Sequence, residues 1–369
     1  MRFLACFVIF VTFIQFINSL INALLSEKLR PSSDEKSFSH NEKVSILIPA
    51  RNEEAHIGNL LSDIDKLTYK NVEVIVYDDE STDRTAEIVN DFALHNHRIQ
   101  LVSSEKLPDG WLGKNYACHV LSSHARGDYF LFVDADVRLK NSVIEDSIDF
   151  ANKYQTALLS VFPKQIMITR GEKKSVPIMN YILLTLLPLV FVRKSPFSSH
   201  AAANGQFMFF RASVYRKYDL HRLFGNSPVE DIAISRYLKK KHEKIACLVG
   251  DERIQCRMYA NYEEALNGFS KNVRMFFGNS TFLAFIFWFV TTLGFIPVVT
   301  SHFNFVVIVL YFILYLATKV LVSLVSRQSV VDNLKYIFWQ QLFLIQVIIK
   351  SISSSHSKNL LWKDRKIYS

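Results

Sequence analysis

The chain has 369 residues, of which 50% are hydrophobic, 13% aromatic and only 21% charged. This composition excludes a disordered protein and a small disulfide scaffold, and it is too apolar for an ordinary soluble enzyme. The net charge of +9 is compatible with nucleic acid, an anionic membrane surface or an anionic substrate. The four cysteines form no CxxC pair, so we expect structural thiols in a reducing compartment.

The N-terminal segment is the first strongly apolar one. Residues 3–25 contain no charged residue, are long enough to cross a bilayer and are followed by no small-residue cleavage site. We therefore expect a retained transmembrane anchor within residues 1–30. Residues 31–42 are rich in Ser and charge, and we interpret them as a linker.

Residues 43–280 alternate short β-rich runs with amphipathic helical patterns. This alternation predicts an α/β domain with a mostly parallel sheet. Strands are expected over residues 44–49, 72–77 and 128–133, and a helix over residues 57–67, where apolar residues recur at helical spacing. Ligands of such open sheets bind at the carboxyl ends of the strands.

Acidic motifs follow each of these strands. They are Pro-Ala-Arg-Asn-Glu-Glu at residues 49–54, Asp-Asp-Glu-Ser-Thr-Asp at residues 78–83 and Asp-Ala-Asp at residues 134–136. Paired carboxylates can bind a hard divalent cation together with phosphate oxygens, although solvated loop residues are the alternative. The chain has no GxGxxG motif and no phosphate loop, which removes the main support for a dinucleotide dehydrogenase or an ATPase.

This ordered set of motifs resembles family 2 membrane glycosyltransferases, whose GT-A fold is Rossmann-like with a mostly parallel sheet. The resemblance extends to Glu230-Asp231, which is similar to the family's ED motif, and to residues 362–365, which are similar to its C-terminal WKGR motif. It implies a nucleotide-sugar donor, here a UDP-sugar, and a divalent cation, Mg²⁺ or Mn²⁺.

The resemblance also implies roles for individual residues. Glu53 and Asp79 would hold the uridine of the donor. Asp134 and Asp136 would approach the diphosphate and bind its metal. Asp231 would act as the catalytic base on the acceptor, although an acidic residue at a helix start also suits the helix dipole without any catalytic role.

Two cations are candidates for stabilising the charge on the leaving diphosphate. These are Lys114 and Arg274, with solvated surface cations as the alternative interpretation. Processive members of the family carry QxxRW where this chain retains only Arg274 of that motif. This departure counts against a polysaccharide synthase and favours the transfer of a single sugar.

Within the family, residues 48–54, 110–118 and 132–137 resemble enzymes that esterify a C30 carotenoid acid with glucose from UDP-glucose in staphyloxanthin-type pigment synthesis. Hopanoid-associated glycosyltransferases share much of this pattern, so a hydroxyl lipid such as a hopanoid or diacylglycerol stays open as the acceptor. A hydroxyl needs a base such as Asp231, whereas a carboxylic acid with a pKa of about 4 is already ionised. A noncatalytic binding protein of the same fold is the remaining alternative.

Further apolar segments lie outside the acidic motifs. Residues 281–299 and 303–325 are expected to span the membrane, with Lys319 snorkelling to its surface. Residues 336–349 are expected to lie at the membrane surface, so residues 281–352 form a C-terminal transmembrane and interfacial region. Residues 176–192 are expected to form membrane-surface helices within the domain of residues 43–280.

The C-terminal tail, residues 353–369, is basic. Because cytoplasmic segments carry an excess of Lys and Arg, we expect a multi-pass cell-membrane protein with a cytoplasmic catalytic domain. The expected partners are a UDP-sugar, an apolar lipid or carotenoid acceptor, the membrane and other pigment-pathway enzymes. Nucleic acid is not expected as a partner, because Lys239-Lys240-Lys241 is more simply a solvated or lipid-facing helix end.

Overall fold

A computed structural model describes residues 1–29, 41–104, 106–356, 361–362 and 365–366. The chain divides into two compact units, each built from three separate segments. The helical unit comprises Met1–Ser26, Gln165–Leu189 and Arg257–Leu360, and the sheet unit comprises Glu27–Lys164, Val190–Cys256 and Leu361–Ser369. The domain limits predicted from the sequence stay predictions. Most of the predicted linker, and Lys358 and Lys363 of the basic tail, lie outside the described residues.

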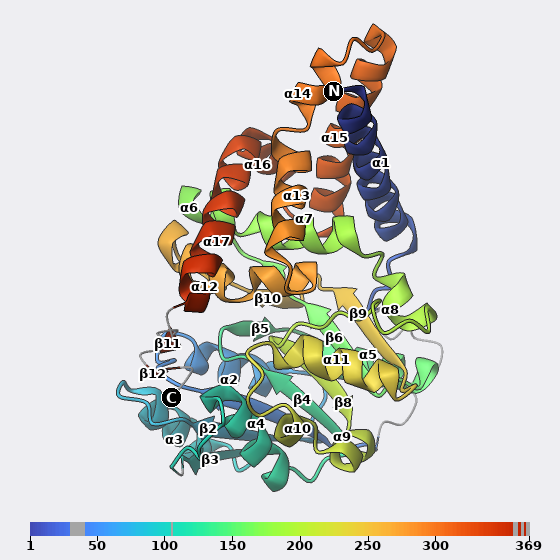
Figure 1. Cartoon of the computed structure of the whole chain (residues 1–369). Helices are drawn as coiled ribbons and strands as arrows, with labels where there is room; N and C mark the ends of the chain where they lie inside the picture. The colour runs from blue at the N-terminus through green and yellow to red at the C-terminus, as the bar shows by residue number, and fades with distance from the viewer. Residues whose placement is uncertain (30–40, 105, 357–360, 363–364, 367–369) are drawn as a thin grey trace. The chain divides into compact units, whose positions relative to one another are not determined.

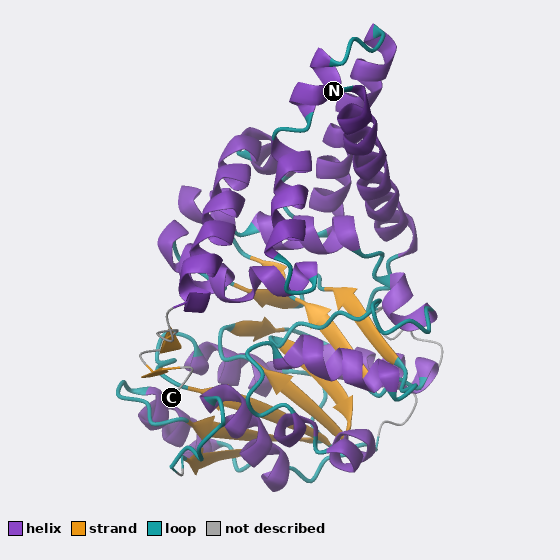
Figure 2. Cartoon of the chain, viewed as in Figure 1, coloured by secondary structure: helices purple, strands orange, loops and turns teal. Residues whose placement is uncertain are grey.

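The sheet unit is organised around a seven-stranded sheet in the order β3-β2-β1-β4-β8-β6-β9 (Figure 2). Its strands are β1 (Val44–Ala50), β2 (Val72–Asp78), β3 (Ile99–Ser103), β4 (Tyr129–Val133), β6 (Leu158–Phe162), β8 (Phe207–Arg211) and β9 (Ile245–Val249). Neighbouring strands are parallel except where β8 runs antiparallel between β4 and β6. The predicted α/β fold with a mostly parallel sheet is therefore confirmed.

Shorter strands and helices complete the sheet unit (Figure 1). A second sheet has the order β5-β10-β7, from β5 (Val137–Leu139), β10 (Ile254–Cys256) and β7 (Lys164–Gln165). The helices are α2 (Ile57–Lys66), α3 (Thr85–His95), α4 (Gly113–His124), α5 (Val143–Tyr154), α8 (Val190–Lys194), α9 (Ala212–Tyr218), α10 (Leu220–Leu223) and α11 (Glu230–Lys240). Strands β11 (Leu361–Trp362) and β12 (Arg365–Lys366) pair near the C-terminus.

The core of the sheet unit follows the apolar patterns of the sequence. Every residue of β1 and β4 is buried, as expected for central strands covered on both faces. Helix α2 buries Ile57, Leu60, Leu61 and Ile64, which are the positions that the helical spacing selects. Burial of this apolar surface is the main stabilising contribution to the fold.

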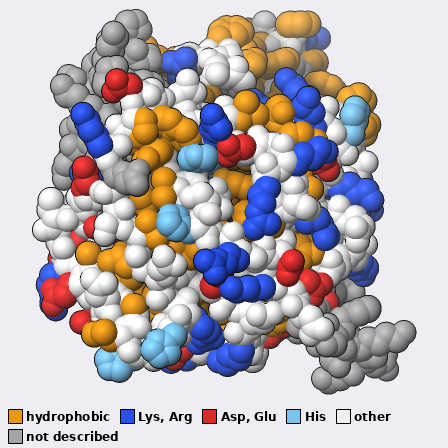
Figure 3. Space-filling model, turned by 90° about the horizontal axis from the view of Figure 1, so that it is seen from below, with side chains coloured by type: hydrophobic (Ala, Val, Ile, Leu, Met, Phe, Trp, Pro, Cys, Tyr) orange, Lys and Arg blue, Asp and Glu red, His pale blue; other side chains and the backbone are white. Residues whose placement is uncertain are grey.

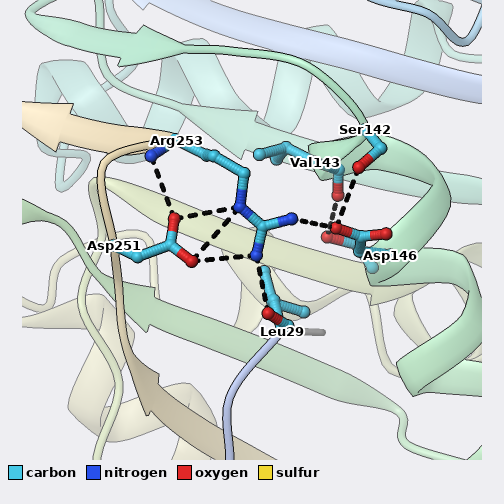
Figure 4. A network of polar contacts seen from close by, with 7 residues as sticks. Leu29, Ser142, Val143, Asp146, Asp251 and Arg253 are labelled. Carbon is cyan, nitrogen blue, oxygen red and sulfur yellow. Dashed lines mark hydrogen bonds and ion pairs between the residues drawn. The ribbon is translucent and has the colours of Figure 1, made fainter. Parts of the chain in front are cut away.

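A polar network ties the segment after the first helix to the rest of the sheet unit (Figure 4). The Arg253 guanidinium pairs with Asp146, whose side chain is fully buried, and with Asp251 at 2.9 Å. It also donates a hydrogen bond to the carbonyl of Leu29 at 2.6 Å. A buried carboxylate is tolerated only when it is paired and hydrogen-bonded, so Arg253 and Asp146 depend on each other.

The helical unit contains the apolar segments. Its elements are α1 (Arg2–Leu25), α6 (Arg170–Ser175), α7 (Pro177–Leu186), α12 (Tyr262–Asn272), the 3-10 helix η1 (Val273–Phe277), α13 (Thr281–Thr292), α14 (Phe295–Thr300), α15 (Phe305–Val325), α16 (Val330–Lys335) and α17 (Ile337–His356). Helices α1 and α15 are long and apolar enough to cross a membrane. The prediction of an N-terminal span is confirmed to that extent.

Helix α1 packs through a narrow seam that becomes polar toward its C-terminal end. The seam consists of Ala5, Val8, Thr12, Gln15, Ser19 and Asn22. Asn22 Nδ2 donates to the carbonyls of Leu184 and Leu187, at 2.9 and 3.0 Å, and Asn22 Oδ1 accepts from Leu189 N at 2.8 Å. These bonds satisfy carbonyls that the end of α7 would otherwise leave free.

The other predicted membrane segments differ from expectation in two respects. Residues 281–299 are not one helix, because the chain breaks between α13 and α14 at Gly294, where a Cβ atom would lie only 2.3 Å from the carbonyl of Val290. The prediction that Lys319 snorkels is wrong, because this residue is 3% exposed and its Nζ is buried. Residues 176–192 form a broken helix pair as predicted, whereas their position relative to a membrane stays a prediction.

Cationic side chains are unevenly spread over the face of the molecule shown in Figure 3. Lys and Arg side chains gather in the right half of that view, with apolar side chains among them. Gathered cations of this kind attract anionic groups in general and do not identify one.

Candidate active site

Two loops at the carboxyl ends of β1 and β2 are joined by hydrogen bonds. Asn52 N donates to Ser81 Oγ at 3.0 Å, and Asn52 Oδ1 accepts from Thr82 N at 2.9 Å. Glu53 N donates to Thr85 Oγ1 at 2.8 Å. Asn52 has a φ of 51°, which is in the left-handed region that Asn tolerates well. The motifs at residues 49–54 and 78–83 therefore form one rigid rim.

Asp79 lies at the inner side of this rim. It is 3% exposed, and its N–H donates to the carbonyl of Ala50 at 2.8 Å. The Arg51 guanidinium lies 3.9 Å from Asp79 Oδ2 and donates to the Asp79 carbonyl. Sequence reasoning gave Arg51 no role. Its position inside the motif of residues 49–54 could have indicated that it belongs to the site.

Lys114 and Asp134 form the central ion pair of the site. Lys114 lies in the first turn of α4, Asp134 directly follows β4, and Lys114 Nζ is 2.6 Å from Asp134 Oδ1. Burial alone would lower the pKa of Lys114, but Asp134 and then Glu230 raise it above its usual value. Lys114 is therefore a fixed cation held among carboxylates.

Asp136 presents a buried carboxylate oxygen to the site. Its Oδ1 is buried and has no hydrogen-bond partner among the residues that the structure describes. Burial, together with the charges of Asp134 and Glu53, raises the pKa of Asp136 to about 7. Cys256 lies beside it, because β5 and β10 pair Val137 with Cys256.

The carboxylates fit the divalent cation that the resemblance implies. Hard cations prefer oxygen ligands, and a buried oxygen without a partner is suited to accept one. No group of three or more His, Cys, Asp or Glu residues in the described part of the chain could hold a metal alone. Asp134 and Asp136 would therefore share such an ion with donor phosphate oxygens and water, as a magnesium-type site does.

Glu230 and Asp231 approach the site from the start of α11. Asp231 Oδ2 accepts a hydrogen bond from Gly205 N at 3.0 Å. A Cβ atom on Gly205 would lie 3.4 Å from both Glu230 Oε1 and Lys114 Nζ. Burial raises the pKa of Asp231, and it raises that of Glu230 to about 7. The position of Glu230 beside Lys114 was not predicted, although it was visible as half of the Glu-Asp motif.

Asn115 fixes the start of α4 against the loop that precedes α11. Its Nδ2 donates to the carbonyls of Phe224, Gly225 and Ser227 at 2.9, 3.2 and 2.9 Å. Trp111 packs on Gly225, where a Cβ atom would lie 2.7 Å from the indole ring. These contacts position Lys114, and the sequence offered no signal for the role of Asn115.

The predicted site residues divide between the two units. Lys114, Asp134, Asp136 and Asp231 come together in the sheet unit, with Glu53 close enough to affect the pKa of Asp136. Arg274 belongs to η1 of the helical unit, and its proximity to this site stays a prediction. The roles assigned to all these residues also stay predictions.

Known proteins that are similar to this chain are glycosyltransferases. Residues 45–224 match the profile of Glycosyl transferase family 2. The chain is 27% identical over 241 residues to a 4,4'-diaponeurosporenoate glycosyltransferase of Staphylococcus haemolyticus, a match that covers 63% of this chain and 61% of that protein. It is 39% identical over 138 residues to the enzyme of that name from Staphylococcus aureus strain USA300, covering 36% and 34%. The chain thus spans less than two thirds of these relatives.

A solved structure supports the fold. The mannosyltransferase PcManGT from Pyrobaculum calidifontis, solved in complex with GDP-Man and Mn²⁺, aligns with a TM-score of 0.57 at 15% identity. The alignment covers 95% of this chain and 99% of that protein. The GT-A-like architecture expected from the sequence motifs is therefore confirmed.

Proposed function

Because residues 45–224 match the profile of Glycosyl transferase family 2, we propose that the chain is a glycosyltransferase that transfers a single sugar, with inversion, from UDP-glucose to an acidic membrane lipid. The proposed acceptor is the carboxyl group of a C30 carotenoid acid, as the names of the relatives suggest. The observation that carries the proposal is the convergence of Lys114 with Asp134 at 2.6 Å, next to the unpartnered Oδ1 of Asp136.

On the donor side, charge neutralisation is the main task. Glu53 and Asp79, at the rim, would hold the nucleoside. Asp134 and Asp136 would hold a divalent cation, which supplies Lewis-acid stabilisation of the leaving diphosphate. With Asp134 engaged by the ion, the Lys114 ammonium would be free to pair with the phosphate oxygens of the donor. A cation fixed in advance stabilises the transition state without reorganisation.

On the acceptor side, the ionisation state of the nucleophile matters. A carboxylate attacks without a general base, and a single displacement at the anomeric carbon inverts its configuration. A hydroxyl acceptor would need Asp231, and the raised pKa of Asp231 favours such a base. A hydroxyl lipid is therefore the second candidate acceptor.

The membrane supplies the acceptor in this proposal. Helices α1 and α15 are long and apolar enough to cross a bilayer. We assign the protein to the cell membrane as a multi-pass protein with its sheet unit on the cytoplasmic side, where nucleotide sugars are available.

The test is mass spectrometry of lipids after incubation of the full chain, in bilayers, with Mn²⁺, UDP-glucose and either a C30 carotenoid acid or a hydroxyl lipid. The wild type should add one hexose to the carotenoid acid. Asp136→Asn should lose this product by a factor of about 100 or more. Asp91→Asn, a change at an exposed position of α3, is the control and should retain it.

Asp231→Asn separates the two acceptors. Transfer to the carotenoid acid should continue in this variant, whereas transfer to a hydroxyl should stop. A ladder of products with many hexoses would contradict single transfer and indicate a polymer synthase. The absence of any hexose-shifted lipid with the folded wild type would refute the carotenoid assignment.

A further inference from the structure

Lys319 is a buried cation in the helical unit. It lies in α15, a helix long and apolar enough to cross a membrane, and is 3% exposed. Its Nζ has no hydrogen-bond partner among the described residues. Lys319 is six residues before the end of α15, or about 9 Å along the helix axis at about 1.5 Å per residue. Ionisable residues inside membrane segments are costly and commonly mark functional sites.

No carboxylate in the described part of the helical unit neutralises Lys319. Glu172 pairs with Arg257 at 2.7 Å, and Asp332 pairs with Lys173 at 2.9 Å. The two others, Glu263 and Glu264, are exposed in the first turn of α12. The ammonium charge of Lys319 therefore has no counterion within this part of the chain.

Aromatic rings cover the ammonium. Lys319 Nζ lies 3.3 Å from the centroid of the Tyr181 ring and 5.9 Å from that of Tyr315. A cation over an aromatic face is stabilised electrostatically, but this contact offsets only part of the cost of burying an ion. Its three N–H donors are left without an acceptor.

Two further hydrogen-bond donors of the helical unit are also buried without an acceptor in the described part of the chain. Tyr181 Oη and Gln15 Nε2 are buried without hydrogen-bond partners in the described residues. Helices α1, α7 and α15 pack on one another, and Tyr311 of α15 clusters with Val8 of α1. The two helices begin at the same end, where Arg2 donates to the carbonyl of Ser301. Gln15 follows Val8, and Lys319 follows Tyr311, by about two helical turns, so Lys319 lies at about the level of Gln15. Unsatisfied donors from three mutually packed helices thus lie at about the level of one buried positive charge.

We propose that Lys319, with Tyr181 and Gln15, binds the carboxylate that ends a long apolar chain, inside the helical unit. A carboxylate supplies the missing counterion and acceptors for all these donors. It is favoured over a phosphodiester, whose substituents on both sides keep it at the level of the headgroups. Because Nζ is covered, the carboxylate reaches it by rotation of the Lys319 side chain away from the Tyr181 ring.

Two sources share this chemistry. One is an apolar acid of the acceptor class proposed above, and the other is a free fatty acid of the bilayer. The site itself rests on the donors of the helical unit and does not depend on the proposed transfer reaction.

The test measures binding of cis-parinaric acid, a fluorescent polyene fatty acid, to the full chain in detergent micelles. No donor sugar or turnover is needed, so the outcome is independent of the proposed function. The wild type should bind the acid saturably and at least about tenfold more tightly than Lys319→Met, the loss expected when one charge-assisted contact is removed. The methyl ester of the acid should bind both proteins equally.

Controls keep the test decisive. Lys335→Met removes an exposed cation of the same unit and should bind the acid like the wild type. Tyr181→Phe keeps the aromatic ring but removes one donor, so it should weaken binding by a smaller factor. The thermal midpoint of Lys319→Met should not fall, because Met replaces a buried ion with an apolar side chain of similar length. Equal affinity of Lys319→Met and the wild type for the acid would overturn the proposal.

Displacement identifies the source. Displacement of cis-parinaric acid by a C30 carotenoid acid supports an acceptor-class occupant, and displacement by oleate alone supports a fatty acid. Displacement by phosphatidic acid, but by neither carboxylic acid, would overturn the assignment in favour of a phosphate site.

Discussion

At the scale of single residues, Lys114 is the side chain on which the charge balance of the site depends. It neutralises Asp134 at 2.6 Å and lies close to Glu230. Without Lys114, the carboxylates at this edge of the sheet would repel one another in the absence of a metal. Lys114 is therefore the counterion of Asp134 in this structure, and in the proposed function it would turn to the donor phosphates.

We expect Lys114→Met to reduce the turnover number by a factor of about 100 or more, because a preorganised cation at the leaving group is lost. The measurement is steady-state transfer with saturating Mn²⁺ and UDP-glucose. Lys140→Met, at an exposed position of the same unit, should keep the wild-type rate. A small loss confined to KM would mean that Lys114 contributes to ground-state binding only.

Glu73 gives the sheet unit a defined sensitivity to acid. Its carboxylate accepts from Lys43 Nζ at 2.6 Å, Ser45 Oγ at 2.5 Å and Arg126 N at 2.6 Å. Burial alone would raise the pKa of Glu73, but these bonds lower it below its usual value. The folded state therefore binds this proton less readily than the unfolded chain does.

The sign of the pH dependence follows from this lowered pKa. The stabilisation from Glu73 is present above the unfolded pKa of about 4.5 and is lost as pH falls through the lower folded pKa. Glu73→Gln should lower the free energy of unfolding by about 1.5 to 3 kcal/mol near neutral pH. Thermal unfolding of both proteins at several pH values should show the difference shrinking below about pH 4.5. A difference independent of pH would contradict this assignment.

Sequence motifs were informative for residues that carry charge and less so for residues that position them. Asp134, Asp136 and Asp231 could be selected because they follow strands or begin a helix within acidic motifs. Asn115 could not, because its partners are backbone carbonyls more than a hundred residues away. Such partners depend on the tertiary fold and leave no local pattern.

At the scale of elements, the Arg253 network joins helix α5, the turn before β10 and the segment that follows α1. Asp146 comes from α5, and its buried carboxylate also accepts from Ser142 Oγ at 3.1 Å. Arg253 is thus the only cation of the network drawn in Figure 4 that faces both Asp146 and Asp251. Loss of this cation would leave a charge buried in the sheet unit.

Arg253→Met should therefore lower the free energy of unfolding by about 3 to 5 kcal/mol, the usual result of breaking a buried ion pair on one side. Chemical denaturation of the purified protein measures this loss. Adding Asp146→Asn should recover part of it, because the unpaired charge is removed. Arg222→Met, which affects an exposed pair, is the control and should change stability little.

Element types were predictable where the periodicity was strong. Strands β1, β2 and β4 and helix α2 lie close to their predicted limits. The direction of β8 was not predictable, because a buried apolar strand has the same sequence pattern in either orientation. The break between α13 and α14 was missed because composition over residues 281–299 reports apolarity and not helix continuity.

At the scale of the whole molecule, the chain passes between the two units several times. Residues 165–189 return to the helical unit between two segments of the sheet unit. The end of α7 in that returning segment is held by Asn18 and Asn22 of α1, which donate to the carbonyls of Thr185 and Leu184 at 2.8 and 2.9 Å. The first helix is therefore a structural part of its unit as well as a helix long and apolar enough to cross a membrane.

A variant that lacks residues 1–26 should accordingly lose its native helical packing. The expected result is aggregation in size-exclusion chromatography under detergent conditions in which the full chain is monodisperse, because the α7 carbonyls and the seam partners of α1 lose their contacts. Leu24→Ala in the full chain, at a residue that is 72% exposed, is the matched control and should stay monodisperse. A monodisperse truncated protein would contradict this structural role of α1.

Because β8 is antiparallel to β4, the start of β8 lies at the same edge of the main sheet as the end of β4. Val133, at the end of β4, pairs with Phe207, at the start of β8. The segment that brings Gly205 to this edge is therefore arriving at the sheet, whereas the segment that carries Asp134 is leaving it. Substitutions or insertions upstream of Gly205 can reshape one wall of the site while the departing loops keep their geometry. If the proposed transfer holds, the wall at Gly205 can therefore be changed to admit another acceptor while the donor side is kept.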